Sequence, residues 1–491
     1  MNKRKSGILL HITSLPGNEG TGTLGKNAFQ FVDFLVKSNQ KLWQILPLGQ
    51  VGCGNSPYQC YSAFAGNIQL IDLELLAKEG WLTKADLKAP AFSAQKADFE
   101  AAGKWKLPLL MKAYENFQKN TAPFINEYFY FQYEHDWWLN DFALFMALKE
   151  HFGGVSWNNW PDEIKFRKPD AIQKYAEKLK VETDAWKFFQ WLFFRQWHKL
   201  KDYTNEKGIE IIGDVPLYVS SDSADVWANT DIFYLDEDLN PTEVGGVPPD
   251  YFSKTGQLWG NPVYNWPRLE ERNFDWWISR LKFNLNMFNL VRIDHFRGLE
   301  SYWSVPAGEK TAVNGKWVPA KGFELLARFR YLFGSLPFIA EDLGVITPEV
   351  EKLRDDFHLM GIKVLQFAFG SDATNENLPH NYKNNFLVCT GTHDNDTTLG
   401  WLNSVKSKEK KMIKKYLGEG EKALQNAIEM VWSSTARLAV LPMQDLLALG
   451  TEARMNIPGT ATGNWGWRFE WKQLKPEYQQ NLKELTEKYN R

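Results

Sequence analysis

Eight short apolar runs recur along the chain, separated by amphipathic or irregular stretches. Several runs are continuously apolar rather than alternating, which is typical of parallel strands covered by helices. Eight such units predict an α/β fold of the (β/α)8 TIM-barrel type. The runs are residues 7–12, 42–48, 209–215, 290–294, 337–341, 361–369, 387–391 and 437–443.

The spacing of the runs predicts one catalytic barrel over residues 1–491, with insertions between strands at its C-terminal face. About 160 residues separate the second and third runs and about 75 separate the third and fourth, against roughly 30 per unit in a plain barrel. Amphipathic stretches at 130–152 and 183–200 predict a helical insertion subdomain over 73–200, whose Trp and Phe stripes we interpret as helix packing. A second insertion is expected over 220–285.

The second insertion contains a segment, residues 245–262, that has the composition of a lid. Its glycines supply hinges, its prolines stiffen the middle, and Tyr251, Phe252 and Trp259 offer apolar area. An irregular surface loop explains the same composition. Farther along, residues 301–322 predict a hairpin that turns at its Asn-Gly pair.

Four acidic residues lie at or just after the ends of four apolar runs: Asp214, Asp294, Glu341 and Asp394. The carboxyl ends of parallel barrel strands point to the same rim, so acids far apart in sequence become neighbours in space. We therefore expect these four carboxyl groups to share one site.

The spacing of residues around Asp294 predicts which side chains share a face of the strand. Residues two apart on a strand share a face, so Arg292 and Asp294 project together, while Val291 and Ile293 face the covering helices. A guanidinium keeps a neighbouring carboxylate ionised, as a nucleophile at the anomeric carbon of a sugar must be. A purely structural Arg-Asp pair would show the same spacing.

Glu341 ends an apolar stretch, where desolvation raises the pKa of a carboxyl group and prepares it to donate a proton. Asp342 is the competing candidate for that role. His393, Asp394 and Asp396 follow one another in a single turn, which suits the clamping of sugar hydroxyls, metal ligation or simple turn chemistry.

A metal or nucleotide cofactor is not expected. The four acids could gather a divalent cation, but Arg292 already supplies positive charge among them. The chain has 8 His with no H-x-x-x-H pair, and it lacks both a G-x-x-x-x-G-K-[ST] and a strand-following G-x-G-x-x-G motif. We predict no metal and no cofactor.

The net charge of -2, from 57 basic and 59 acidic residues, favours neutral ligands over nucleic acid or an anionic membrane. Cys53, Cys60 and Cys389 form no C-x-x-C pair, which favours a reducing compartment. The apolar stretch 7–10 is too short for a signal peptide, and no run approaches the roughly 20 apolar residues of a membrane span. A cytoplasmic protein is expected.

Aromatic residues are abundant, with 22 Trp, 18 Tyr and 33 Phe. Most are expected in the core, but Tyr58, Trp259 and Trp465 stand beside polar residues and glycines. Flat rings next to hydrogen-bonding groups suit a sugar, which has an apolar face and a polar edge.

Together these motifs resemble a known family. In order, GDVPLYV, VRIDHFRG, IAEDLG and GTHDNDT resemble the four sequence regions of the α-amylase clan. With NSPYQ at 55–59, the lid segment and GTATGNWGWR at 459–468, the whole chain is similar to bacterial 4-α-glucanotransferases (amylomaltases or disproportionating enzymes) of glycoside hydrolase family 77.

The resemblance implies roles for individual residues. Asp294 matches the catalytic nucleophile, Glu341 the general acid/base, and Asp394 the third carboxylate, which holds sugar hydroxyls and stabilises the transition state. Further matches are Asp214, Arg292 and His393 around the attacked sugar, Tyr58 stacking on that sugar, Gln257, Trp259 and Asn464 contacting the glucan, and Asp372 and His380 in a segment that also resembles the family.

The resemblance also implies a retaining transfer between maltooligosaccharides or other α-1,4-glucans, with the Asp294 and Glu341 carboxyls about 5–5.5 Å apart. A monomer is expected. An α-1,4-glucan hydrolase, which uses water as acceptor, is the alternative enzyme, and a non-catalytic glucan-binding protein is the alternative from another class.

Overall fold

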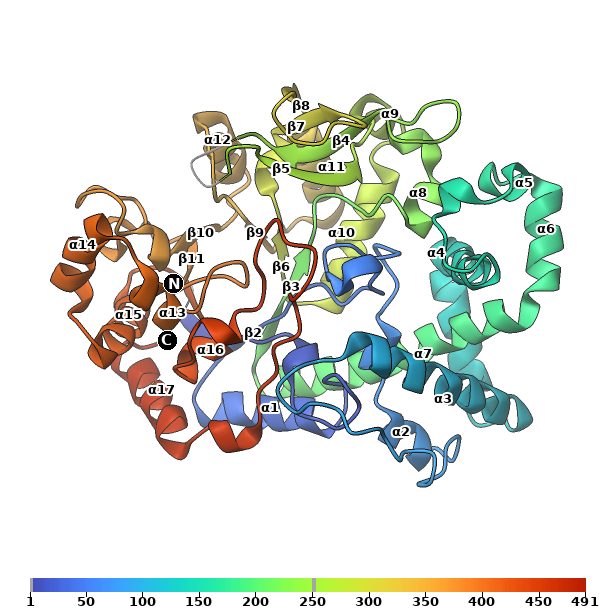
Figure 1. Ribbon diagram of the computed structural model, residues 1–491, viewed down its shortest axis with the longest axis horizontal. Helices are drawn as coiled ribbons and strands as arrows, with labels where there is room; N and C mark the ends of the chain where they lie inside the picture. The colour runs from blue at the N-terminus through green and yellow to red at the C-terminus, as the bar shows by residue number, and fades with distance from the viewer. Residues whose placement is uncertain (1–2, 250–252) are drawn as a thin grey trace.

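The computed structural model describes residues 3–249 and 253–491. Within this part of the chain, eight parallel strands form one sheet in the order β10-β11-β12-β1-β2-β3-β6-β9. A parallel bridge between Ile339 and Met360, with the Ala340 N–H donating to the Met360 carbonyl at 2.7 Å, joins the two edges and closes the barrel. The TIM-barrel prediction is confirmed (Figure 1). The strands are β1 (Lys5–Leu9), β2 (Leu42–Gln44), β3 (Glu210–Val215), β6 (Leu290–Ile293), β9 (Phe338–Ala340), β10 (Gly361–Val364), β11 (Phe386–Cys389) and β12 (Leu438–Pro442).

Side chains alternate between two apolar layers. Ile212 of β3 and Leu290 of β6 belong to the layer that fills the barrel, whereas Val291 and Ile293 belong to the layer between strands and helices. The prediction that Val291 and Ile293 face the helices is confirmed. Because side chains two apart share a face, Arg292 continues the inner row toward the carboxyl end of its strand.

The apolar run 361–369 is longer than the strand it contains. β10 ends at Val364, and residues Leu365–Phe367 form a 3-10 turn in which the Gln366 amide donates to the Asp396 carbonyl at 2.9 Å. The expectation of a strand through residue 369 is therefore wrong. Ala368 and Phe369 are buried without pairing in the sheet, which explains why the apolar run extends beyond the strand.

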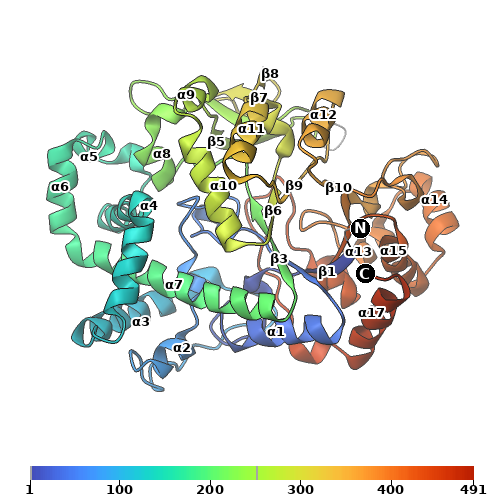
Figure 2. The ribbon, with the colours of Figure 1, turned by 180° about the vertical axis from the view of Figure 1, so that it is seen from behind.

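The segment between β2 and β3 is helical. Its two longest helices, α4 and α7, pack along each other, and the last turns of α7 also pack against α1 and β3, so that α7 links this segment to the barrel (Figure 2). The α7 aromatic side chains Phe188, Phe189 and Trp191 are buried, as helix packing requires. The helices here are α1 (Lys26–Lys37), which precedes β2, then α2 (Leu73–Lys78), α3 (Phe99–Lys119), α4 (Ile125–His151), α5 (Asp162–Lys165), α6 (Pro169–Lys178) and α7 (Lys180–Glu206).

A second, antiparallel sheet stands beside the barrel mouth in the order β5-β4-β7-β8 (Figure 1). Its strands are β4 (Glu243–Val247), β5 (Gln257–Pro262), β7 (Ser301–Pro306) and β8 (Lys316–Pro319). Both ends of the expected lid segment 245–262 are thus strands rather than irregular loop. Tyr251 and Phe252 lie outside the described residues.

The hairpin expected over 301–322 is present as β7 and β8, and residues 313–314 form a turn, but Asn314-Gly315 does not close the hairpin as a two-residue loop. The register pairs Ser304 with Lys316, and the whole segment from 307 to 315 connects the strands. The Trp303 indole N–H donates to the Ala312 carbonyl at 2.8 Å, so the connection folds over this ring instead of closing in two residues.

The remaining helices lie against the outside of the barrel, near the antiparallel sheet, and in the C-terminal part of the chain (Figure 2). Among the described residues, no helix is both long and apolar enough to cross a membrane. These helices are α8 (Ala224–Ala228), α9 (Trp266–Glu271), α10 (Asp275–Met287), α11 (Gly322–Phe333), α12 (Pro348–Asp356), α13 (Thr398–Ser404), α14 (Ser407–Leu417), α15 (Glu421–Ser433), α16 (Met443–Leu446) and α17 (Pro476–Lys488).

Candidate active site

A buried arginine joins two of the four acids at the barrel rim. Arg292 donates through Nη1 to both carboxylate oxygens of Asp214 at 2.8 Å, and its Nη2 lies 2.8 Å from Asp294 Oδ1. The register explains this arrangement, since Asp214 and Arg292 are paired positions of neighbouring strands, and Asp294 follows two residues later on the same face. The Arg292 side chain is 6% exposed and that of Asp294 is 29% exposed, so Asp294 is the member of this trio that solvent or substrate reaches.

The charge state of the trio follows from burial and proximity. Burial alone would lower the pKa of Arg292, but the neighbouring Asp214 and Asp294 raise it well above its usual value, so the guanidinium stays charged. Burial raises the pKa of the Asp214 carboxyl, and Arg292 opposes that rise. The Tyr58 hydroxyl, kept protonated because burial and Asp214 raise its pKa, donates to Asp214 Oδ2 at 2.7 Å.

Glu341 follows β9 and lies in a different environment. Its Oε2 accepts the backbone N–H of His295 at 2.7 Å, and its Oε1 accepts that of Leu343 at 3.1 Å. Burial, with a smaller contribution from Asp294, raises the pKa of Glu341 to about 8, against the opposing effect of Arg292. A protonated carboxyl therefore stands beside the Arg292-bound carboxylates at neutral pH.

Asp342 points away from this group. It forms a buried ion pair with Arg354 of α12 and accepts the Ile362 N–H of β10 at 2.7 Å. Its side chain is 2% exposed. Asp342 thus ties α12 to the barrel wall, while Glu341 faces the rim.

The turn after β11 contains the fourth acid. Asp394 Oδ1 accepts the Asn456 amide at 2.6 Å and lies 3.4 Å from His393 Nε2. The His393 ring stacks on Tyr58, with ring centroids 5.1 Å apart and planes at 18°. Asp396 serves the turn itself, because its carboxylate accepts hydrogen bonds from the Thr397 N–H and the Thr451 hydroxyl, both at 2.8 Å.

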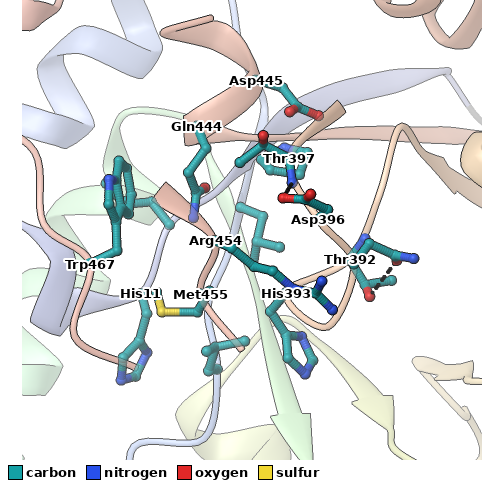
Figure 3. Close-up of a pocket in the computed structure, with 15 residues that line it drawn as sticks. His11, Thr392, His393, Asp396, Thr397, Gln444, Asp445, Arg454, Met455 and Trp467 are labelled. Atoms are coloured by element: carbon teal, nitrogen blue, oxygen red, sulfur yellow. Dashed lines mark hydrogen bonds between the residues drawn. The ribbon is translucent and has the colours of Figure 1, made fainter. Parts of the chain in front are cut away.

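A cavity lined by both polar and apolar side chains, His393 among them, lies at the barrel mouth (Figure 3). His11 lines it, and the Nδ1 atom of His11 is buried with no hydrogen-bond partner among the described residues. Burial, and then the proximity of His393, lower the pKa of His11 to about 3, so its ring is neutral. Figure 3 shows Asp396 and Asp445 at the opposite end of this cavity.

Of the residues expected to contact glucan, Trp259 and Gln257 lie on β5, which reaches the rim, whereas Asn464 bonds within its own loop. Trp259 of β5 packs against the ring of His295, with centroids 4.8 Å apart and planes at 90°, and its indole N–H donates to the Gln257 amide oxygen at 3.3 Å. Strand β5 therefore reaches the residue directly after Asp294. The Asn464 amide instead closes its own loop, accepting the Ile457 N–H at 3.0 Å and donating to the Thr460 carbonyl at 3.0 Å.

Asp372 and His380 lie in an exposed loop after β10. Asp372 accepts hydrogen bonds from the N–H and hydroxyl of Thr374, and His380 lies 3.0 Å from the Ala373 carbonyl and stacks on Tyr416 of α14. Their described contacts are within this loop and to α14, not with the four acids.

Three residues at the site were not expected from the sequence. His295 contacts both Glu341 and Trp259. Its position inside the VRIDHFRG motif could have indicated from the sequence that it belongs to the site. Arg454 and Asn456 hold Asp394 from about 60 residues away. No local pattern connects two segments so far apart.

Among the described residues, no group of three or more His, Cys, Asp or Glu side chains has an arrangement that could hold a metal ion. The Asp214 and Asp294 carboxylates instead face the guanidinium of Arg292. Positive charge at this rim is therefore supplied by the chain itself.

Comparison with known proteins assigns the family. The sequence model of the 4-alpha-glucanotransferase family, glycoside hydrolase family 77, matches residues 10–474. The chain belongs to this family. It is 50% identical to the 4-alpha-glucanotransferase of Synechocystis sp., covering 100% of this chain and 99% of that protein, and 49% identical to that of Thermus thermophilus, covering 99% and 98%. The family resemblance of the sequence is thereby confirmed, and the chain is an enzyme of the glucanotransferase class.

Solved structures agree with this assignment. The amylomaltase of Streptococcus agalactiae in complex with acarbose superposes with a TM-score of 0.97 at 41% identity, and each chain is covered to 100%. The amylomaltase of Corynebacterium glutamicum, at 17% identity, shares the fold with a TM-score of 0.78, covering 98% of this chain and 75% of that one.

The contrast between Glu341 and Asp342 gives a first prediction. Asp342→Asn removes the buried carboxylate partner of Arg354 and should lower the free energy of unfolding by about 3 kcal/mol. The matched control is Asp355→Asn, because Asp355 binds the same guanidinium at 2.8 Å with a side chain 57% exposed; it should cost less than about 1 kcal/mol. Denaturant unfolding measures both, and equal costs would contradict the structural assignment of Asp342.

The raised pKa of Glu341 predicts a pH-dependent stability. The folded state holds this proton up to about pH 8, whereas the unfolded chain releases it near 4.5, so the stabilisation from the neutral carboxyl is lost as pH rises through about 8. Glu341→Gln mimics the neutral acid at every pH. We expect the unfolding free energy of this variant, relative to the unsubstituted protein, to increase steadily between pH 5 and pH 8. A difference that stays constant over this range would show that Glu341 titrates normally.

Proposed function

We propose that this enzyme transfers segments of α-1,4-glucans, maltooligosaccharides among them, to the 4-hydroxyl of an acceptor glucan or glucose by a retaining double displacement. The observation that carries the proposal is that two carboxyls at one rim lie in different environments. Asp294 is bound to a permanently charged arginine, and Glu341 is held neutral by burial. Environments that separate two carboxyl groups in this way assign one as nucleophile and the other as acid.

In the first step an Asp294 oxygen attacks the anomeric carbon as the glycosidic bond breaks. The Glu341 proton passes to the departing oxygen, which leaves as the 4-hydroxyl of the released chain. The product is a glucosyl ester of Asp294, and Glu341 is now a carboxylate. The Asp294 and Glu341 carboxyls are expected about 5–5.5 Å apart for this chemistry, and this separation stays a prediction.

In the second step Glu341 takes the proton from the 4-hydroxyl of an acceptor glucan. The acceptor oxygen attacks the anomeric carbon and displaces Asp294, so the two inversions restore the α configuration. Asp394 is the candidate for holding the sugar hydroxyls as positive charge develops on the ring. Tyr58, Asp214 and His393 would surround the same sugar, with Asp214 supporting Arg292 and Tyr58 by its hydrogen bonds.

Transfer rather than hydrolysis requires that water be kept from the ester. The antiparallel sheet next to the rim presents Trp259 beside His295, and an aromatic ring there offers an acceptor sugar an apolar face. Gln257 adds a hydrogen-bonding group on the same strand. The similarity to the 4-alpha-glucanotransferases of Synechocystis sp. and Thermus thermophilus supports a glucan rather than water as acceptor.

Incubation with maltotriose tests the function. A ladder of longer maltooligosaccharides together with glucose is expected, because each transfer lengthens one molecule as it shortens another. Chromatography of the products over time measures it. A gain of reducing ends without any longer product would identify an α-1,4-glucan hydrolase, and an unchanged substrate would identify a non-catalytic glucan-binding protein.

Removal of the nucleophile tests the mechanism. Asp294→Asn keeps the size of the side chain but cannot form the glucosyl ester, so kcat on maltotriose should fall by at least about 10⁴-fold. Circular dichroism should show an unaltered fold. Asp396→Asn is the matched control, because that acid binds Thr397 and Thr451 in the same rim. Comparable loss in both variants would argue against a special role for Asp294.

A further inference from the structure

Asp394 is held by the C-terminal part of the chain. The Asn456 side-chain amide donates to Asp394 Oδ1 at 2.6 Å, and Arg454 Nη2 donates to the Asp394 backbone carbonyl at 2.7 Å. Both donors belong to the segment after α16, which returns to the centre of the molecule before α17 begins (red in Figure 1). The side chain and the backbone of Asp394 are thus fixed by one short segment.

The two donors are themselves connected. Arg454 Nε donates to the Asn456 carbonyl at 2.8 Å, so one guanidinium contacts the backbone on both sides of the Asn456–Asp394 pair. The next residue, Ile457, donates its N–H to the Asn464 amide oxygen at 3.0 Å. Asn464, which the family resemblance suggested as a glucan contact, therefore also supports the backbone beside Asn456.

The hydrogen bond distinguishes the two oxygens of Asp394. Oδ1 accepts the Asn456 amide, whereas Oδ2 has no hydrogen-bond donor among the described residues. The Asp394 side chain is 46% exposed, so without this contact its carboxylate could rotate. A hydrogen bond to an ionised acceptor is strong enough to select one rotamer and to leave the other oxygen for a ligand.

An amide is well suited to this task. It orients the carboxylate without placing a positive charge against it, so the attraction between the acid and a sugar that develops positive charge is not cancelled. Arg454, which does carry charge, binds the carbonyl and not the carboxylate of Asp394. The segment thus orients the carboxylate of Asp394 without placing the charge of Arg454 against it.

We propose that Asn456 is a positioning residue for the transfer reaction: it fixes Asp394 so that Oδ2 is presented to the hydroxyls of the bound glucan, while Arg454 holds the backbone in register. The proposal rests on the proposed function of the site. It predicts that Asn456 acts only through Asp394, and that the energetic effects of the two residues are coupled.

A double-mutant cycle tests this coupling. Asn456→Ala should lower kcat for glucose release from maltotriose roughly tenfold or more, as expected for loss of a hydrogen bond to an ionised group, with a smaller change in KM. In an Asp394→Ala background, where the partner is absent, the same substitution should lower the residual rate less than twofold. Equal losses in the two backgrounds would overturn the proposal, because a merely structural role does not depend on Asp394.

Two further variants make the cycle specific. Asn456→Asp keeps the shape of the side chain but turns a carboxylate toward Asp394, so its loss of kcat should exceed that of Asn456→Ala. Thr462→Ala, an exposed position in the same loop, should retain the rate of the unsubstituted protein. A smaller loss in Asn456→Asp than in Asn456→Ala would also contradict the proposal. Glucose is released by transfer and by hydrolysis alike, so the cycle remains decisive even if the maltotriose ladder is absent.

Discussion

The contact on which the site depends is the buried guanidinium of Arg292 between Asp214 and Asp294. A charge taken out of water is costly unless it is paired and hydrogen-bonded, and here two carboxylates at 2.8 Å provide the pairing. The geometry exists because β3 and β6 are neighbours in the barrel and are in the register that puts Asp214 opposite Arg292. Loss of either acid would leave a buried cation under-compensated, so the ion pair between Arg292 and Asp294 is built into the sheet.

The same rim holds Glu341 in a different environment, where burial raises its pKa to about 8. Two carboxyls so near each other differ because one faces the guanidinium directly, while the other accepts only backbone N–H groups in a buried position. The chain turns sharply at His295, whose φ of 51° is left-handed, and this turn brings its N–H to Glu341 immediately after Asp294. Asp294 and the N–H that binds Glu341 therefore belong to adjacent residues of one turn, which limits the relative movement of the two carboxyls.

Elements outside the barrel complete the site from two directions. The antiparallel sheet, made from segments before and after β6, brings Trp259 to His295, and the segment after α16 brings Asn456 to Asp394. Without the segment after α16, neither carboxylate oxygen of Asp394 would have a hydrogen-bond donor among the described residues. These added elements therefore place side chains at the rim that the barrel strands do not supply.

Local pattern determined the barrel strands, the shared face of Arg292 and Asp294, and the turn that holds His393 and Asp394, because each depends on residues close together in sequence. The order of the motifs also identified the family. Only the tertiary structure decided that Asp342 pairs with Arg354 and that Glu341 faces the rim, since two adjacent acids have the same sequence signal. It also decided that the lid pairs with the hairpin as one sheet, and that Asn456 holds Asp394. These are contacts between distant segments, whose partners are chosen by the packing of the whole barrel and not by any neighbouring residue.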